Sequence, residues 1–331
     1  MSEEIMVSVI CTVYNHEKYL RKCLDGFVMQ KTNFKFEVLI HDDASTDGSA
    51  DIIREYEKKY PDIIKPIYQT VNQYSQGIKV SQTYLYPRAK GKYLAFCEGD
   101  DYWCDENKLQ KQFDVMEANN ELSACLHRVS LIKEAGELTG DFYPRVEMPE
   151  GIKSTDEMIR LLFKSDGYPF HTSSIFVKTE YVIDLTTKDV LFYKESPAGD
   201  FPMYLYFALM GKIYYFDESM SCYRLFSIGS YTERQKKNKE FYIKNLKSWL
   251  LMYNEFNLYT NRKYNDILQT QLEKTQFELL FCLQDYRKII KMRNTNVFKK
   301  LSNKEKIWII LNAYFPHIMK LYKKSKDKNN A

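Results

Sequence analysis

The sequence predicts an α/β fold in which helices flank a mostly parallel β-sheet and a helical extension follows. In the first 130 residues, short apolar runs rich in β-branched residues alternate with amphipathic segments of helical length. This alternation is typical of parallel sheets that carry helices on both faces. From about Asn238 onward the apolar spacing is helical throughout.

The expected elements follow one another along the chain. Strands are predicted at Val7–Thr12, Phe36–Ile40, Ile64–Tyr68 and Tyr93–Cys97, and helices at Lys18–Gln30, Gly48–Lys59, Val80–Ala89 and Glu106–Ala118. Farther on, the pattern predicts helices near Thr155–Phe163 and Phe201–Met210, a strand at Ser174–Lys178, and a hairpin of Lys212–Phe216 and Ser219–Arg224. Parallel sheets bind ligands beyond the carboxyl ends of their strands, so the residues that follow each strand are the site candidates.

Three regions are expected: an α/β domain over 1–235, a helical extension over 236–300 and a basic amphipathic tail over 301–331. Positions 286–331 hold 13 Lys and Arg residues against 2 Asp and Glu residues, whereas the formal charge of the whole chain is only +4. The basic charge is therefore concentrated near the C-terminus. A broad nucleic-acid surface on the main domain is not expected.

Location is inferred from two further features. No apolar run approaches the roughly 20 residues that cross a bilayer, and the first six residues carry two glutamates and no Lys or Arg, which argues against a secretory signal. Seven widely spaced cysteines without a CxxC pair argue against a disulfide framework or a zinc site. These features predict a cytoplasmic protein.

Two acidic clusters follow expected strands. His41–Asp47 comes after the second strand, and Glu98–Asp101 after the fourth. Adjacent carboxylates repel one another, and a hard cation such as Mg²⁺ or Mn²⁺ relieves this repulsion and can bridge a diphosphate. Each cluster also has a plainer explanation, since Ser45 or Asp47 can cap the helix near Gly48 and Glu98–Asp101 can form a solvated turn. Their joint occurrence favours a metal site.

Together, Val7–Asn15, Asp42–Asp47 and Glu98–Asp101 resemble, in order, the motifs of the large family 2 of inverting glycosyltransferases, over roughly residues 5–232. The resemblance implies the GT-A nucleotide-diphospho-sugar transferase fold, which is Rossmann-like. It also implies a nucleotide-diphosphate sugar as donor, Mn²⁺ or Mg²⁺ as cofactor, and a glycan or lipid-linked hydroxyl as acceptor. The setting it implies is bacterial cell-envelope polysaccharide synthesis.

The resemblance assigns the donor site residue by residue. Thr12 and Tyr14 match positions that hold the nucleoside, with Tyr14 against the base. Asp43 matches the acceptor of the base imide N–H, which favours a UDP- or dTDP-sugar. Asp100 is expected near the ribose and Asp101 on the cation. The family's usual Asp-x-Asp-Asp motif has Glu98 in its first position here, so the role of Glu98 is left open.

The catalytic base and the groups at the diphosphate are also implied. Asp200, at the start of an expected helix, matches the base that deprotonates the acceptor hydroxyl, although many relatives carry Glu-Asp where this chain has Gly199-Asp200. Asp200 could also cap that helix. Arg224 and Ser230 match a Tyr-Arg and Gly-Ser segment that closes over the diphosphate, while an ordinary surface salt bridge is the alternative for Arg224.

Two residues carry balanced alternatives. Trp103 either forms the floor beneath the donor sugar or belongs to the core. His171 matches a stretch that lines the acceptor side in relatives, yet a histidine beside a strand is more often a structural hydrogen-bonding group.

The tail and two rival functions complete the prediction. Lys304–Lys324 places Trp308, Leu311, Phe315, Met319 and Tyr322 on one face among lysines, which suits peripheral contact with an anionic membrane, such as the inner face of the plasma membrane, or packing on the protein itself. The long helices also suit a homodimer. A pyrophosphorylase or dinucleotide oxidoreductase is disfavoured because no glycine-rich loop follows the first strand, and a non-catalytic binding scaffold on the same fold is the remaining alternative.

Overall fold

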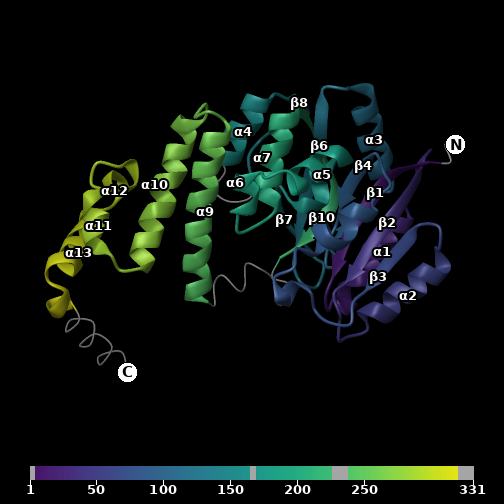
Figure 1. The fold of residues 1–331 in the computed structure, drawn as a ribbon, viewed down its shortest axis with the longest axis horizontal. Helices are drawn as coiled ribbons and strands as arrows, with labels where there is room; N and C mark the ends of the chain where they lie inside the picture. Colours follow the sequence, from purple (N-terminus) through teal and green to yellow (C-terminus); the bar gives the residue numbers. More distant parts are fainter. Residues whose placement is uncertain (1–3, 165–168, 226–237, 320–331) are drawn as a thin grey trace. The chain divides into compact units, whose positions relative to one another are not determined.

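The computed structural model describes residues 4–164, 169–225 and 238–319 (Figure 1). The chain divides into two compact units, the first made of Met1–Val190 with Ala198–Ile228 and the second of Leu191–Pro197 with Gly229–Ala331. The boundary expected near residue 235 lies outside the described residues.

A ten-stranded sheet forms the centre of the first unit, with the main order β3-β2-β1-β4-β9-β6-β10-β5. Strands β1 to β4 pair in parallel, β9 runs antiparallel between β4 and β6, and β6 and β10 are parallel neighbours. The strands are β1 (Ile5–Val13), β2 (Lys35–Asp42), β3 (Ile64–Tyr68), β4 (Tyr93–Phe96), β5 (Tyr102–Trp103), β6 (Leu122–Ile132), β7 (Leu138–Tyr143), β8 (Gly151–Lys153), β9 (Phe176–Lys178) and β10 (Lys212–Arg224). The sheet places the ends of β1, β2 and β4 at one edge.

Amphipathic helices cover the sheet and build the core. In α1 (Glu17–Val28), Leu20, Leu24 and Phe27 recur at helical spacing and are fully buried. They belong to one apolar cluster with the inner residues of β1, β2 and β4 and with side chains of two other helices. The remaining α-helices of this unit are α2 (Ser49–Lys59), α3 (Lys108–Ala118), α4 (Thr155–Lys164), α5 (Thr179–Thr187) and α7 (Asp200–Met210).

The expected hairpin after residue 212 is wrong, because Lys212–Arg224 forms the single strand β10. The register of β10 against β6 shifts between Phe216 and Ser219, which is a bulge. Asp217 and Glu218 face solvent there and pair with Arg128 and Lys111. The polar pair Asp217-Glu218 between two apolar runs therefore forms a bulge within one strand and not the turn of a hairpin.

The helix expected at Val80–Ala89 is irregular. A π-helical stretch covers Ser81–Leu85 and a 3-10 turn covers Tyr86–Arg88. Pro87 has no backbone N–H to donate, so a regular α-helix cannot continue through it.

The second unit is helical. Helices α9 (Lys239–Tyr259) and α10 (Asn265–Cys282) pack against each other, with α6 (Leu191–Lys194) against α9. Three shorter helices, α11 (Tyr286–Lys291), α12 (Asn296–Lys300) and α13 (Asn303–Tyr314), share an apolar cluster with the end of α10. Among the described helices, none combines the length and apolar character needed to cross a bilayer.

The apolar residues expected on one face of the tail divide between the two alternatives, since some pack on the protein itself and others are exposed. Trp308 packs beside Tyr286 and Phe281, with ring centroids 5.2 and 5.7 Å apart, and Met319 is buried. Leu311 and Phe315 are exposed, as expected, whereas Tyr322 lies outside the described residues. Trp308 is therefore partly buried against the apolar cluster of the second unit.

Candidate active site

The loops that follow β1 and β2 are tied together at the carboxyl edge of the sheet. Asn15 and Ala44 have left-handed backbones, with φ of 57° and 60°, a conformation that costs free energy in residues other than glycine. The Asn15 backbone N–H donates to Ser45 Oγ at 3.0 Å, and Asn15 Oδ1 accepts from the Thr46 backbone N–H at 2.8 Å. These bonds fix the loop conformations.

The residues expected to hold a nucleoside lie on these loops. Thr12 is near the end of β1, and Tyr14 follows the strand with 45% of its surface exposed. The Asp43 carboxylate is buried and accepts from the backbone N–H groups of Gln73 and Tyr74, at 2.7 and 3.0 Å. Tyr74, 55% exposed, is thereby brought close to Asp43. Each oxygen of Asp43 keeps a lone pair for a ligand.

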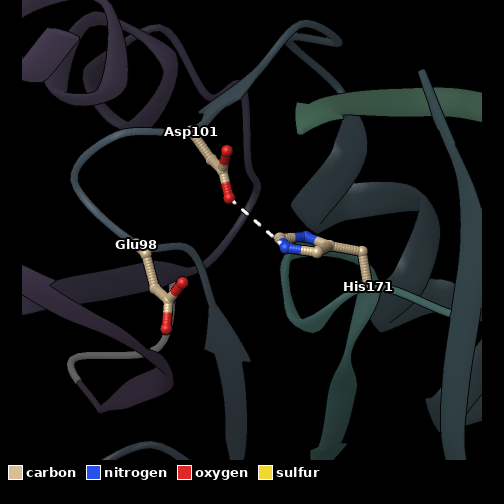
Figure 2. Close-up of side chains that lie close together, drawn as sticks. All are labelled: Glu98, Asp101 and His171. Atoms are coloured by element: carbon tan, nitrogen blue, oxygen red, sulfur yellow. Dashed lines mark ion pairs between the residues drawn. The ribbon is translucent and has the colours of Figure 1, made fainter. Parts of the chain in front are cut away.

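Glu98, Asp101 and His171 come together beyond the end of β4, as Figure 2 shows. One ligand atom from each lies within 4.8 Å of the others. The Asp101 carboxylate is almost fully buried, and its Oδ2 lies 3.5 Å from His171 Nε2. Gly99 makes this turn possible, because a Cβ there would lie 2.7 Å from Nδ1 of His16. Two carboxylates and an imidazole at this spacing can hold one divalent cation.

The electrostatics of this cluster favour a cation. Burial, followed by the charge of Asp100, raises the pKa of Asp101 well above its ordinary value. Glu98 is exposed as a residue, but the surrounding protein atoms reduce the solvation of its carboxylate. This desolvation, followed by the charges of Asp100 and Asp200, raises the pKa of Glu98 to about 8. Burial lowers the pKa of His171 to about 4, so this imidazole is neutral at pH 7. A bound cation would relieve the carboxylate repulsion, and a neutral imidazole can serve as its ligand.

Hydrogen bonds to its other ring nitrogen support His171. Nδ1 lies 2.9 Å from Ser173 Oγ, which lies 2.7 Å from Ser221 Oγ on β10. The Ser173 backbone N–H also donates to Nδ1 at 3.3 Å, so in this structure Nδ1 holds the lone pair and Nε2 carries the proton that faces Asp101. Metal binding at Nε2 requires the other tautomer, in which Nδ1 donates its proton to Ser173 Oγ.

Arg224 braces the acidic turn from the end of β10. Its backbone N–H donates to Asp101 Oδ1 at 2.8 Å, and its Nε donates to the Asp100 carbonyl at 3.0 Å. Nη1 donates to the carbonyls of Lys133 and Glu134. The side chain is buried and lies over the Tyr19 ring, so it is not an ordinary surface salt bridge. Much of its bonding capacity goes to the main chain.

Asp200 begins α7, with Gly199 at the N-cap position, and its Oδ1 accepts from the Phe201 backbone N–H at 2.9 Å. Burial raises the pKa of Asp200 to about 6. The charge of Asp200 also contributes to the raised pKa of Glu98. A carboxylate with the pKa of Asp200 can accept a proton near neutral pH.

Tyr204 lies one helical turn after Asp200, on the same face of α7. Its side chain is fully buried, and its hydroxyl has no hydrogen-bond partner among the residues that the structure describes. Burial, and then the charges of Asp200 and Glu98, raise the pKa of Tyr204. The neighbouring Ser174 hydroxyl donates to the His171 carbonyl at 2.7 Å and not to Tyr204. A buried hydroxyl beside two carboxylates is a donor available to a ligand.

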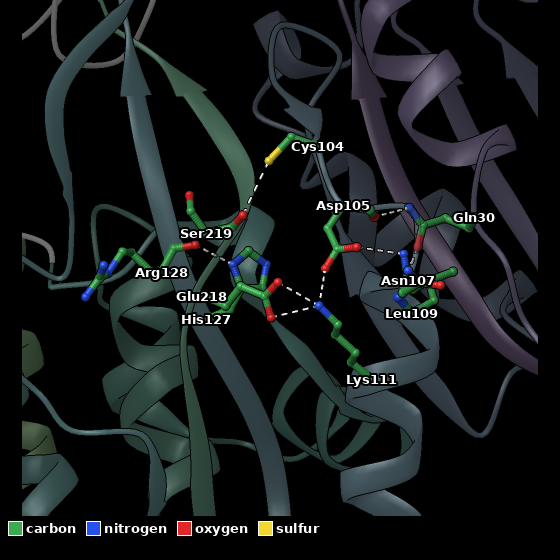
Figure 3. A network of polar contacts seen from close by, with 10 residues as sticks. All are labelled: Gln30, Cys104, Asp105, Asn107, Leu109, Lys111, His127, Arg128, Glu218 and Ser219. Carbon is green, nitrogen blue, oxygen red and sulfur yellow. Dashed lines mark hydrogen bonds and ion pairs between the residues drawn. The ribbon is translucent and has the colours of Figure 1, made fainter.

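A polar network, shown in Figure 3, supports the segment after the acidic turn. Lys111 on α3 binds Asp105 and, across the bulge of β10, Glu218, each at 2.7 Å. The side-chain amide of Gln30 donates to the Asp105 carbonyl at 2.8 Å. The bulge and the segment after the acidic turn are therefore held by the same polar network.

Trp103 belongs to the core and not to the sugar floor. It is 1% exposed, and its ring packs edge-on against Phe27, with centroids 4.8 Å apart. The fully buried Lys108 places its Nζ 4.2 Å from the centre of the Trp103 ring and donates to Gln112 Oε1 at 2.6 Å. Ser230 lies outside the described residues.

The sequence reasoning missed three features of the site. His171 was considered for the acceptor side or as a structural hydrogen-bonding group, and not as a metal ligand; its place beside Asp101 depends on β9 inserting between β4 and β6. Tyr204 could have been found from its i, i+4 spacing to Asp200. No local signal pointed to Tyr74, which follows β3 in an irregular segment.

Comparisons with known proteins show the family of the chain. Residues 8–175 match the model of Glycosyl transferase family 2. An uncharacterized protein of Mycobacterium tuberculosis is 34% identical over 238 residues, an alignment covering 70% of this chain and 63% of that protein. A poly(ribitol-phosphate) beta-glucosyltransferase of Bacillus spizizenii is 37% identical over 105 residues, which is 31% of this chain and 16% of that enzyme.

Solved structures show the same fold. The UDP complex of S. aureus TarS residues 1–349 has a TM-score of 0.56 at 18% identity, covering 95% of this chain and 82% of that one. The mannosyltransferase PcManGT of Pyrobaculum calidifontis, solved with GDP-Man and Mn²⁺, has a TM-score of 0.52 at 16% identity, covering 95% and 85%. These likenesses confirm the expected GT-A fold.

Proposed function

The chain belongs to glycosyl transferase family 2, and on that premise we propose that it transfers a sugar, with inversion, from a nucleotide diphosphate to an acceptor hydroxyl. One observation carries the proposal: Glu98, Asp101 and His171 form a cation-sized cluster beside a carboxylate whose pKa is raised to about 6. A base and a diphosphate-binding cation are what a direct displacement at the anomeric carbon requires.

The donor site extends from the cation cluster to the loops after β1 and β2. Asp101, with Glu98 and His171, would hold Mn²⁺ or Mg²⁺. Because an imidazole suits Mg²⁺ poorly, Mn²⁺ fits this set of ligands better. When bound, the cation neutralises charge on the departing diphosphate. Tyr14 and Asp43 receive the base, and an Asp43 carboxylate that accepts a hydrogen bond favours uracil or thymine. PcManGT, solved with Mn²⁺, is consistent with this choice of metal.

The chain's own residues perform the proton transfer. Asp200 accepts the proton of the acceptor hydroxyl as that oxygen attacks the anomeric carbon on the face opposite the diphosphate. Its backbone hydrogen bond from Phe201 fixes the carboxylate at the helix start. Tyr204 donates a hydrogen bond to a ligand oxygen beside Asp200. Arg224 keeps Asp100 and Asp101 in place. Thr12, Asp100, Arg224 and Ser230 complete the proposed donor site.

The acceptor is proposed to be a glycan or lipid-linked hydroxyl in cell-envelope polysaccharide synthesis. This part of the proposal is supported by the local similarity to the poly(ribitol-phosphate) beta-glucosyltransferase. The chain matches 63% of the length of the Mycobacterium relative. The complete activity of this chain is therefore part of the same proposal.

Ligand-dependent thermal stability tests the donor site. UDP, dTDP, GDP and their sugars are added with Mn²⁺, with Mg²⁺ or with chelator, and the apparent Tm is measured. A ligand at 100 times its Kd stabilises the native state by about 2.7 kcal/mol, so we expect a clear shift with a uridine or thymidine nucleotide and Mn²⁺. Asp101→Asn should lose the metal-dependent shift, although its amide oxygen can still accept from Arg224.

The matched control is Asp62→Ala, an exposed carboxylate before β3, which should keep the full shift. If every nucleotide leaves the Tm of the wild type unchanged under all metal conditions, the donor site is not functional. A nucleotide shift with no transfer to any acceptor and no hydrolysis of the sugar nucleotide would favour a non-catalytic binding scaffold instead.

A further inference from the structure

One face of α13 exposes an unbroken stripe of large apolar side chains. Ile307, Ile310, Leu311 and Tyr314, called here the outer face of α13, are 57%, 43%, 37% and 61% exposed. These residues recur at spacings of three and four, so they share one side of the helix. The stripe continues past the helix end with Phe315 and Ile318, which are 52% and 61% exposed.

The opposite face of the same helix is already used. Ile309 and Ala313 are buried in the cluster with Tyr286 and Ile289 of α11, and Trp308 packs beside them. An ordinary surface helix places its apolar residues on this inward face and polar residues on the other. The outer face of α13 is therefore not needed for the fold of this unit, and a contiguous exposed apolar patch marks an interaction surface.

The charge around this face selects the partner. Between positions 285 and 319 the chain carries eight Lys and Arg residues and two acidic residues, Glu305 and Asp285, the second of which pairs with Lys288. Glu305 caps its own helix by accepting from Ser302. The exposed Lys304 adjoins Ile307 and Leu311 at helical spacing. A second copy of this chain would bring a second set of these cations close, which costs free energy, whereas an anionic lipid surface offers both hydrocarbon and negative charge.

We propose that the outer face of α13 is a peripheral membrane anchor that lies in the interfacial region of a bilayer containing anionic lipid. The isoleucines and Leu311 enter the acyl boundary, and Tyr314, apolar over its ring and polar at its hydroxyl, suits the headgroup level. The surrounding lysines contact anionic headgroups. α13 has 12 residues, which fits a helix lying along the surface. This anchor does not depend on the sugar transfer proposed above.

Vesicle sedimentation tests the anchor directly. The full chain is mixed with phosphatidylcholine vesicles containing 0% or about 30% phosphatidylglycerol, a fraction chosen to give an anionic surface potential. Binding is expected only to the anionic vesicles and should weaken as salt is added. The double variant I307E/Y314E should bind at least about tenfold more weakly, because two anchoring residues are replaced by carboxylates. K304Q should weaken binding by about fivefold.

The matched control is L251E/L258E. These leucines are 49% and 55% exposed on α9, and the two replacements change the net charge by the same amount. This variant should bind vesicles as the wild type does. All variants should keep the wild-type Tm and nucleotide-dependent shift, since the changed side chains are exposed. A loss of binding can then be separated from a failure of the donor site.

Three results would overturn the anchor. The first is wild-type chain that stays in solution with anionic vesicles. The second is equal loss of binding in the α9 and α13 variants, which would mean that net charge alone drives association. The third is a dimer in sedimentation velocity that I307E/Y314E converts to a monomer, because a second copy would then cover the face.

Discussion

The cation cluster and the outer face of α13 depart from ordinary burial in opposite ways. At the end of β4 the protein buries Asp101 and leaves the buried Tyr204 hydroxyl without a partner. In the second unit, α13 exposes large apolar side chains to water. Buried polar groups without partners and exposed apolar groups both cost free energy in the isolated chain.

The difference indicates what each region binds. A carboxylate cluster that includes the buried Asp101 is stabilised by a cation and hydrogen-bonding ligands, whereas an exposed apolar face is stabilised by a hydrocarbon surface. In each region, the expected partner is the one that would relieve the unfavourable burial of a polar group or the unfavourable exposure of an apolar one. Four predictions test this comparison.

The largest effect is expected at Asp200. Asp200→Asn keeps the oxygen that accepts from Phe201 but cannot take a proton, so kcat for sugar transfer should fall about 10³-fold. Nucleotide-dependent thermal stabilisation should remain. Asp184→Asn, an exposed partner of Lys188, should keep full activity. If Asp200→Asn transfers sugar at the wild-type rate, Asp200 is not the base.

The second prediction compares two neighbouring isoleucines on opposite faces of α13. Ile309 is 1% exposed and Ile310 is 43% exposed. Ile309→Ala should lower the free energy of unfolding by about 2–4 kcal/mol, and Ile310→Ala by no more than about 0.5 kcal/mol, as measured by urea denaturation. Equal costs would show that the outer face is covered in solution, and the comparison would break.

The third prediction concerns the Tyr204 hydroxyl. Tyr204→Phe removes a buried group that lacks a partner, so the free energy of unfolding should rise by about 1–2 kcal/mol. Sugar transfer should nevertheless fall about tenfold in kcat/KM, the value of one hydrogen bond to a ligand. Tyr264→Phe is the control, because its buried hydroxyl also lacks a partner but lies in the second unit. It should gain stability without losing activity.

The smallest effect is a pH dependence. Burial raises the pKa of Asp200 to about 6, and a general base acts only when deprotonated. The kcat/KM for transfer should therefore be constant above about pH 7 and fall tenfold per pH unit below the pKa. A cation bound nearby moves this limb to lower pH. A profile that instead rises as the pH falls would contradict the assignment.

Much of the first half of the fold could be predicted from sequence. Strands β1 to β4 are short apolar runs bounded by polar segments, and the structure confirms all four. Strand β6 was missed because His127, Arg128 and Ser130 interrupt its apolar pattern. Arg128 pairs with Asp217 and Ser130 hydrogen-bonds with Ser219, two partners that lie far away in sequence.

The part of the site that follows the parallel strands could be predicted from the sequence. Glu98–Asp101 was expected to bind a cation because it follows a parallel strand, and the structure gathers Glu98 and Asp101 there. The third candidate ligand, His171, comes from a segment whose neighbour β9 runs antiparallel, and local patterns carry no information about that insertion. The roles of these residues remain predictions for the experiments above.

The buried lysine beneath Trp103 makes folding a proton-coupled reaction. Burial lowers the pKa of Lys108 to about 7, far below the value of about 10.4 for a solvated lysine. Between these two values the unfolded chain holds a proton that the folded chain has released, so stability gains from this group as the pH rises. Near pH 8.5, Lys108 therefore takes up a proton on unfolding, whereas buried thiols such as Cys23 and Cys125, whose pKa values burial raises, release protons. The slope of the calorimetric enthalpy of unfolding against the ionisation enthalpy of the buffer should therefore change by about one proton in Lys108→Met.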